Sequence, residues 1–284
     1  MANAYTGTSL LDRARLSIAH GSLVNSKRPT CFVSGVYPEF LRSGRGAFAY
    51  DMDGKSYIDF IQGLGSTVLG YSHPEVGQAV MDQWSRGANL SLATELEVVT
   101  AEKVKELFPC IERLRFLKTG TESCFSALRI ARAHTCRSLV LSHGFHGHSD
   151  EFQSLTPPHH GVFPSGNIEK LELDNVTDRV AAVIIEPILT DLSTERIEFL
   201  KALREVCTEN GVVLIFDEII TGFRFPKYSV TNHISVTPDL ICLGKAMASG
   251  MPISVVGGKQ KIMECAEYFV SSTFAGETLS LAAA

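Results

Sequence analysis

Four groups of polar residues each follow a short apolar run, and their side chains suit chemistry on a small molecule. The groups are residues 118–123 (Lys-Thr-Gly-Thr-Glu-Ser), Glu186 with Pro187, Asp217 with Glu218, and Gly244 with Lys245. Ligands of open parallel sheets bind beyond the carboxyl ends of the strands, so residues at these places are candidates for a binding site. Taken singly, each group has a plainer explanation: a hydroxyl residue caps a helix, a charged pair is solvated, and Gly-Lys is common in loops.

Together the groups describe one kind of ligand. Gly120 lets backbone N–H groups approach closely, Thr119 and Thr121 offer hydroxyl groups, and the start of a helix adds a positive dipole, so this turn suits a phosphate dianion. Asp217, at the end of a buried strand, can pair with a protonated ring nitrogen, and Lys245 can form a Schiff base with an aldehyde. A phosphate, a pyridinium and an aldehyde occur together in pyridoxal 5'-phosphate (PLP).

Other ligands fit the sequence less well. The P-loop pattern G-x-x-x-x-G-K-[ST] is absent, and Gly63, Gly65 and Gly70 do not form the G-x-G-x-x-G pattern of a dinucleotide site. His143, His146 and His148 fall within six residues, but the spacing is that of a loop and no cysteine or carboxylate cluster completes a ligand set. We therefore predict no metal site.

An α/β body is predicted to position these residues. Residues 98–107 are amphipathic, residues 113–118 are strand-like, and residues 123–133 repeat apolar side chains at helical spacing. Residues 180–218 read as strand, helix and strand, because two apolar runs enclose a helical pattern that ends at Asn210-Gly211. Continuous apolar strands indicate a mostly parallel sheet with helices on both faces.

The two ends of the chain read differently from the body. Residues 50–60 predict a hairpin with Asp53-Gly54 at its turn, which suggests a small N-terminal subdomain. We expect residues 1–60 to form this helix and hairpin segment, and residues 61–284 to form the large cofactor-binding domain. Residues 279–284 are an apolar, helix-favouring stretch that stops without a polar tail, so we expect a chain cut inside a helix, with its C-terminal domain truncated.

The composition indicates which kinds of partner and which cellular compartment to expect for this protein. The 284 residues carry a net charge of −5 and no basic run, which makes nucleic acid a poor partner and small molecules a better one. Seven cysteines, with no C-x-x-C pair, read as reduced thiols. No apolar run approaches a membrane span and no secretory signal is present, so we predict a cytoplasmic protein.

From about residue 24 to its end, the sequence resembles the class III (ω-type) aminotransferases of PLP-dependent fold type I, and within them glutamate-1-semialdehyde aminomutase and its relatives. The motifs that carry the resemblance lie, in order, at residues 44–54, 70–74, 119–122, 145–148, 185–187, 216–224, 237–240 and 244–246. Agreement of this many motifs in order is very specific. It implies the transferase fold, PLP as cofactor, and an exchange of imines with an amine or amino acid and a carbonyl substrate.

The resemblance also implies roles for individual residues. Lys245 matches the Schiff-base lysine and Asp217 the partner of the pyridine nitrogen, so these two are the predicted catalytic residues. Gly120 and Thr121, with Thr119 beside them, match the residues that bind the phosphate.

Four further positions match residues around the cofactor. Phe145 matches the aromatic residue that stacks on the ring, His146 lies beside it, and Glu186 matches an acid that lines the site. Thr273 matches a residue that reaches the cofactor phosphate of the opposite subunit, which implies a homodimer.

Several features depart from the aminomutase pattern. Phe145 stands where tyrosine is usual, Asp191 is near a place where asparagine often meets the cofactor hydroxyl, and Lys27-Arg28-Pro29 follows residues 24–26 in place of a proline-first run. Residues 153–166 are shorter than the loop that closes over the aminomutase intermediate. A two-step isomerisation needs a closed site, so we favour transfer between molecules over isomerisation. A third possibility is a PLP-binding fragment or split subunit without turnover of its own.

Overall fold

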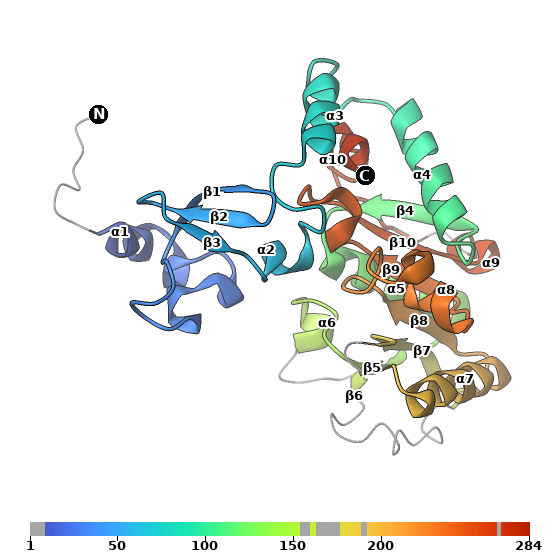
Figure 1. Ribbon diagram of the computed structural model, residues 1–284. Helices are drawn as coiled ribbons and strands as arrows, with labels where there is room; N and C mark the ends of the chain where they lie inside the picture. Colours follow the sequence, from blue (N-terminus) through green and yellow to red (C-terminus); the bar gives the residue numbers. More distant parts are fainter. Residues whose placement is uncertain (1–8, 154–159, 163–176, 189–191, 266–267) are drawn as a thin grey trace. The chain divides into compact units, whose positions relative to one another are not determined.

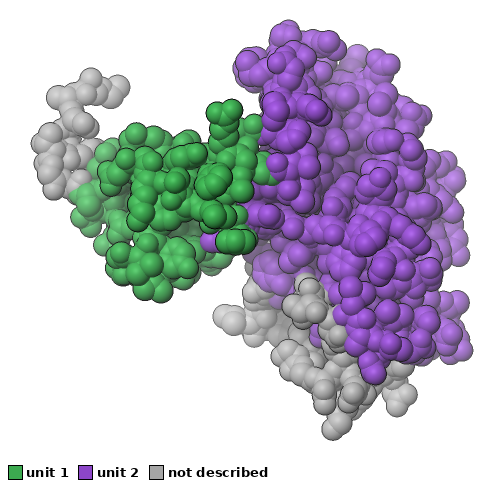
Figure 2. Space-filling model, viewed as in Figure 1, with its two compact units in different colours: residues 1–60, 70–72 green, residues 61–69, 73–284 purple. Residues whose placement is uncertain are grey.

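The chain forms two compact units, which Figure 2 colours separately: residues 1–60 with 70–72, and residues 61–69 with 73–284. The computed structural model describes residues 9–153, 160–162, 177–188, 192–265 and 268–284. Each unit has a sheet of its own, with three strands in the first and seven in the second. We describe each unit by itself.

The first unit contains a short helix and an antiparallel meander. Its elements are α1 (Leu10–Ser17), β1 (Leu41–Arg45), β2 (Phe48–Asp51) and β3 (Ser56–Ile58), with short 3₁₀ turns at Ala19–Gly21, Asn25–Lys27 and Pro29–Cys31. The hairpin predicted around Asp53-Gly54 is confirmed, because Tyr50 pairs with Ser56 across the turn and Gly54 has a φ of 84°. The Asp51 carboxylate accepts hydrogen bonds from the N–H groups of Asp53 and Lys55 and so closes the turn.

The second unit is built on a mostly parallel sheet, in the order β4-β10-β9-β8-β7-β5-β6 (Figure 1). The strands are β4 (Arg113–Leu117), β5 (Leu139–His143), β6 (His160–Val162), β7 (Val180–Ile185), β8 (Val213–Asp217), β9 (Leu240–Leu243) and β10 (Ser254–Gly258). β10 runs antiparallel to both of its neighbours, β4 and β9, and the other strands of this sheet all run in the opposite direction to β10. The mostly parallel α/β fold is therefore as predicted, and the antiparallel β10 is an addition to it.

Helices occupy the chain between the strands. They are α2 (Gln62–Gly65), α3 (Pro74–Trp84), α4 (Glu95–Leu107), α5 (Gly120–Thr135), α6 (Asp150–Gln153), α7 (Thr194–Glu209), α8 (Val230–Ile234), α9 (Gln260–Met263) and α10 (Thr278–Ala283), with 3₁₀ turns at Pro226–Tyr228 and Lys245–Ala248. The helices predicted over 98–107 and 123–133 are confirmed as α4 and α5, and the predicted strand, helix and strand over 180–218 as β7, α7 and β8. None of the helices that the structure describes is long and apolar enough to cross a membrane.

The central strands are buried on both faces, as their continuous apolar sequences require. In β8, Val213 and Ile215 pack in a core with α5 residues such as Leu128, whereas Leu214 and Phe216 pack in a second core with α7 residues such as Leu200. Successive side chains of a strand point to opposite faces. Asp217, two residues beyond Ile215, therefore falls on the face that α5 covers.

Candidate active site

The residues singled out from the sequence gather at one edge of the large sheet. β4, β5, β7, β8 and β9 run in the same direction, so their carboxyl ends share that edge. The predicted residues at these ends are Thr119, Gly120 and Thr121 after β4, Phe145 and His146 after β5, Glu186 after β7, Asp217 at the end of β8 and Lys245 after β9.

Asp217 is 3% exposed, and its carboxylate is held by three donors. One oxygen, Oδ2, lies 2.8 Å from His146 Nδ1 and accepts a bond of 3.3 Å from the Cys124 thiol. The other, Oδ1, accepts the backbone N–H of Ile219 at 3.0 Å. An ionised carboxylate offers about four acceptor positions. Oδ1 therefore keeps one position for a further N–H donor.

Lys245 is half-buried beside this carboxylate. Burial lowers the pKa of its amine, the negative charges of Asp217 and Glu186 oppose that shift, and the positive charge of Arg224 adds to it. The backbone of Lys245 has a φ of 40°, a left-handed conformation that is rare for a residue with a side chain. A lowered pKa keeps more of the amine neutral, and a neutral amine is the form that reacts with an aldehyde or accepts a proton.

Glu186 is 5% exposed and lies under the turn that follows β5. Burial raises the pKa of its carboxyl group, and the backbone N–H of Phe145, which donates to Glu186 Oε2 at 2.8 Å, partly opposes the shift. Gly144 has a φ of 118°, and a Cβ there would overlap Glu186 Oε2, so the turn requires glycine. Phe145 itself is 63% exposed.

The turn after β4 is a helix N-terminus with a capping box. The Thr119 hydroxyl accepts the backbone N–H of Glu122, and Glu122 Oε2 in turn accepts the N–H groups of Lys118 and Thr119. The N-cap is thus Thr119, whereas the plainer explanation of this turn expects Thr121 or Ser123 to cap the helix. The Thr121 hydroxyl bonds to His148, and the N–H groups of Gly120 and Thr121, in the first turn of α5, face outward from the helix start.

These residues fit PLP in each of its three parts. The start of a helix of 16 residues, with glycine first, suits the phosphate. The remaining acceptor position on Asp217 Oδ1 suits a protonated ring nitrogen, and the Lys245 amine with its lowered pKa suits the aldehyde.

A metal is the other ligand to consider at Asp217, because ligand atoms of Cys124, His146 and Asp217 lie within 4.8 Å of one another. Both neighbours, however, direct hydrogen bonds to the same carboxylate oxygen, so the group is arranged as donors around one acceptor. In the part of the chain that the structure describes, His143 and His148 do not join this group.

Glu218 is fully buried. The plainer explanation, that the charged pair after this strand is solvated, is therefore wrong for Glu218. Its carboxylate accepts bonds from Thr221 Oγ1, Val230 N, Thr231 N and Thr231 Oγ1, at 2.7 to 3.1 Å. Burial raises the pKa of this carboxyl group, and these donors oppose the shift. Glu218 therefore fixes the long loop between β8 and α8.

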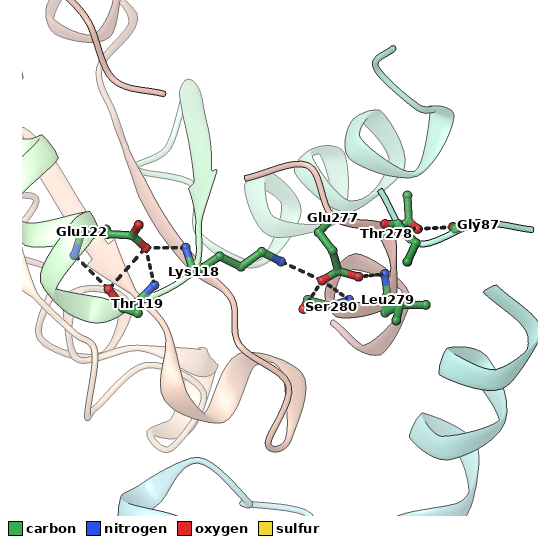
Figure 3. Close-up of polar contacts among 9 residues, drawn as sticks. Gly87, Lys118, Thr119, Glu122, Glu277, Thr278, Leu279 and Ser280 are labelled. Atoms are coloured by element: carbon green, nitrogen blue, oxygen red, sulfur yellow. Dashed lines mark hydrogen bonds and ion pairs between the residues drawn. The ribbon is translucent and has the colours of Figure 1, made fainter. Parts of the chain in front are cut away.

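Thr273 lies in a turn that precedes α10, and Figure 3 shows the polar contacts of Glu277 and Lys118 near the start of that helix. The Thr273 side chain is exposed, and the turn is anchored by Glu277, which caps α10 and pairs with Lys118 Nζ at 2.9 Å. Both charged side chains of this pair are mostly buried. Lys118 directly precedes the turn at the start of α5, so the pair connects that turn to the segment of Thr273.

Cys124 is the site residue that sequence reasoning missed, since it was interpreted only as a buried thiol. The sequence carried one partial signal, because Cys124 follows Gly120 by one helical turn. That α5 covers the sheet face of Asp217 is seen only in the structure. Asp191 lies outside the described residues, as do residues 154–159 and 163–166 of the segment predicted to be a short lid.

Known proteins are similar to this chain in sequence and in fold. The family model for class III aminotransferases matches residues 34–165 and 163–284. Glutamate-1-semialdehyde 2,1-aminomutase of Alkaliphilus oremlandii is 35% identical over 96% of this chain and 71% of its own length. An omega-transaminase from Sphaerobacter thermophilus superposes with a TM-score of 0.87 at 28% identity, over 99% of this chain and 71% of that one.

A second solved structure, the FumI protein of Sphingopyxis sp. MTA144 in its PLP internal aldimine form, also has a TM-score of 0.87 and 28% identity, over 96% of this chain and 70% of that one. The family match spans nearly the whole chain, and the fold and the polar residues at the sheet edge agree with it. The chain belongs to the class III aminotransferase family, and its activity is PLP-dependent transfer of an amino group.

Proposed function

We propose that the chain moves an amino group between two separate molecules, an amine or amino acid donor and a carbonyl acceptor, with Lys245 as the residue that bonds to the cofactor. The observation that carries this proposal is the arrangement of Lys245, Asp217 and the start of α5 at one sheet edge. A second candidate is glutamate-1-semialdehyde 2,1-aminomutase activity, which the 35% identical relative favours. A third is cofactor binding without turnover.

When bound, PLP supplies an electron sink for the bond that breaks at the substrate carbon. Asp217 keeps the proton on the ring nitrogen, because its buried carboxylate retains an acceptor position on Oδ1. Lys245 Nζ is free to take and return a proton, since burial holds the pKa of its amine below the usual range. The N–H groups of Gly120 and Thr121 hold the phosphate, and the exposed Phe145 ring offers a face for stacking.

The proposed function is tested by following the absorbance of the purified chain with PLP while candidate amines are added. We expect conversion to the pyridoxamine form with a donor and reversal with a keto acid. An aminomutase would isomerise added glutamate-1-semialdehyde without an acceptor. A chain that binds PLP but converts with none of these substrates would support the third candidate.

We also propose a homodimer in which Thr273 contacts the cofactor phosphate of the partner subunit. Large apolar side chains are exposed on α3, on the segment before α4, on α4 itself and beside Thr273, namely Met81, Trp84, Leu90, Leu92, Val98, Val99 and Phe274. Hydrogen bonds from Thr278 to the carbonyls of Gly87 and Ala88 hold these segments together. A patch of this kind is typical of a protein interface.

The Thr273→Ala variant is expected to weaken PLP binding roughly tenfold, because a hydrogen bond to a charged phosphate is lost. Equilibrium dialysis measures the affinity, and sedimentation measures the assembly. Thr194→Ala, at an exposed threonine at the start of α7, is the matched control and should bind PLP as the unmodified chain does. A monomer whose PLP affinity is unchanged by Thr273→Ala would contradict the shared site.

The division into an N-terminal segment, residues 1–60, and a cofactor-binding domain, residues 61–284, is also a proposal. So is a cytoplasmic location, which the seven free cysteines favour because such thiols persist where the compartment is reducing.

A further inference from the structure

The side chains of His146 and Cys124 both donate hydrogen bonds to one oxygen of Asp217. The fold explains the positions of these two side chains, but it does not explain what their bonds do. His146 Nδ1 lies 2.8 Å and the Cys124 Sγ 3.3 Å from Asp217 Oδ2. All three side chains are almost completely buried, with relative exposures of 2%, 1% and 3% for His146, Cys124 and Asp217. With two donors on Oδ2, this oxygen is filled, and only Oδ1 can accept from a ligand.

Cys124 also links two parts of the site. It lies one helical turn beyond Gly120, on the helix whose first N–H groups face the proposed phosphate position. Its thiol reaches from that helix to the end of β8. A shift of α5 relative to β8 would break this contact, so the contact fixes the separation between the phosphate end and the ring-nitrogen end of the site.

We propose that Cys124 is a positioning residue for amino transfer: its thiol holds the Asp217 carboxylate so that Oδ1 faces the cofactor, and it locks α5 to β8. This inference rests on the proposed function, since it needs PLP at Asp217. It adds a residue to the site without giving it a part in bond making.

The loss of the thiol should weaken PLP binding. A carboxylate that loses one of its hydrogen-bond donors is held less firmly, so Asp217 Oδ1 is directed less accurately at the cofactor. The groups that face Asp217 are Cys124 on α5, His146 after β5, Glu186 after β7 and Lys245 after β9, with Cys242 beside it in β9. A Cys124 variant loses the contact to Asp217 and the interaction of the thiol with Cys242, while the other groups around Asp217 stay in place.

The experiment compares Cys124→Ala and Cys124→Ser with Cys207→Ala, a second fully buried cysteine that packs in the core on the α7 side of the sheet. PLP affinity and the rate of the half-reaction with a donor amine are measured by absorbance, and thermal melts report stability. We expect Cys124→Ala to bind PLP roughly three- to tenfold more weakly and to slow the half-reaction at saturating PLP. Cys124→Ser, which keeps a donor, should restore the affinity and the rate, and Cys207→Ala should leave both unchanged.

A melting temperature lowered equally in Cys124→Ala and Cys207→Ala, with PLP affinity and the half-reaction rate unchanged in both, would overturn the inference in favour of plain packing. Failure of Cys124→Ser to restore the affinity and the rate would also overturn it. If a Cys124 variant does not fold, the infrared S–H stretch of the unmodified chain and of Asp217→Asn decides: the band should shift when the carboxylate is lost, and an unchanged band refutes the contact. Failure of the proposed function is distinct, because then the unmodified chain itself would not bind PLP.

Discussion

Replacement of Lys245 by alanine is expected to lower amino transfer by a factor of about 10⁴ and to remove covalent attachment of the cofactor. The Lys245 amine is half-buried at the sheet edge, next to Asp217, and burial lowers its pKa. Among the described residues at the sheet edge, no other amine lies beside Asp217 to take over both bonding to the aldehyde and moving the proton. The rate is measured as the half-reaction with a donor amine.

Borohydride reduction of the PLP-loaded chain, followed by peptide mapping, should place the label on Lys245. Lys261→Ala, at an exposed lysine on α9, is the control variant and should keep both label and rate. A label on Lys118 or Lys259 would contradict the assignment; in the structure those two amines are paired with Glu277 and Asp239.

The second large effect is expected from Asp217→Asn, which should slow the half-reaction about 10³-fold while PLP stays bound. A neutral amide cannot hold the proton on the ring nitrogen, so the electron sink is lost. The phosphate contacts proposed at Gly120 and Thr121 do not depend on this charge, so we expect them to retain the cofactor. Rapid-mixing absorbance measures the rate, and dialysis measures the retention.

Asp239→Asn is the matched control, because Asp239 is also a buried aspartate on the same sheet. Its carboxylate pairs with Arg204 and Lys259 at the opposite end of β9 from Lys245, and these partners hold the pKa of the carboxyl group below its usual value against the effect of burial. Asp239→Asn should therefore lower the melting temperature and leave the half-reaction nearly unchanged. Near-normal rates in Asp217→Asn would show that Asp217 has another role.

The elements that local pattern determines could be predicted from the sequence. β7, α7 and β8 followed from two apolar runs around one helical repeat, and the hairpin at Gly54 from a turn dipeptide between strand-like residues. The place of Asp217 and Lys245 at a common edge followed from the rule that parallel strands end together. In each case the information lies within a few residues of the element.

Contacts between distant segments could not be predicted in this way. The bond from Cys124 to Asp217 depends on which helix covers which sheet face, and the four bonds to Glu218 depend on the path of a long loop. Ser254 was also missed: its hydroxyl donates to the Thr119 carbonyl at 2.7 Å, at the same edge of the sheet. Because β10 is antiparallel, its first residue and not its last lies at that edge, and a search for polar residues after strands passes over it.

The position of β4 in the sheet affects how the chain folds during its synthesis. Among the described residues β4 has β10 as its only strand partner, and β10 leaves the ribosome about half a chain length after β4. Until then the turn at Gly120 has no sheet on that side to hold it, and Ser254 is not yet there to bond Thr119. We therefore expect PLP capture at the proposed site to come late in biogenesis, after the sheet is complete.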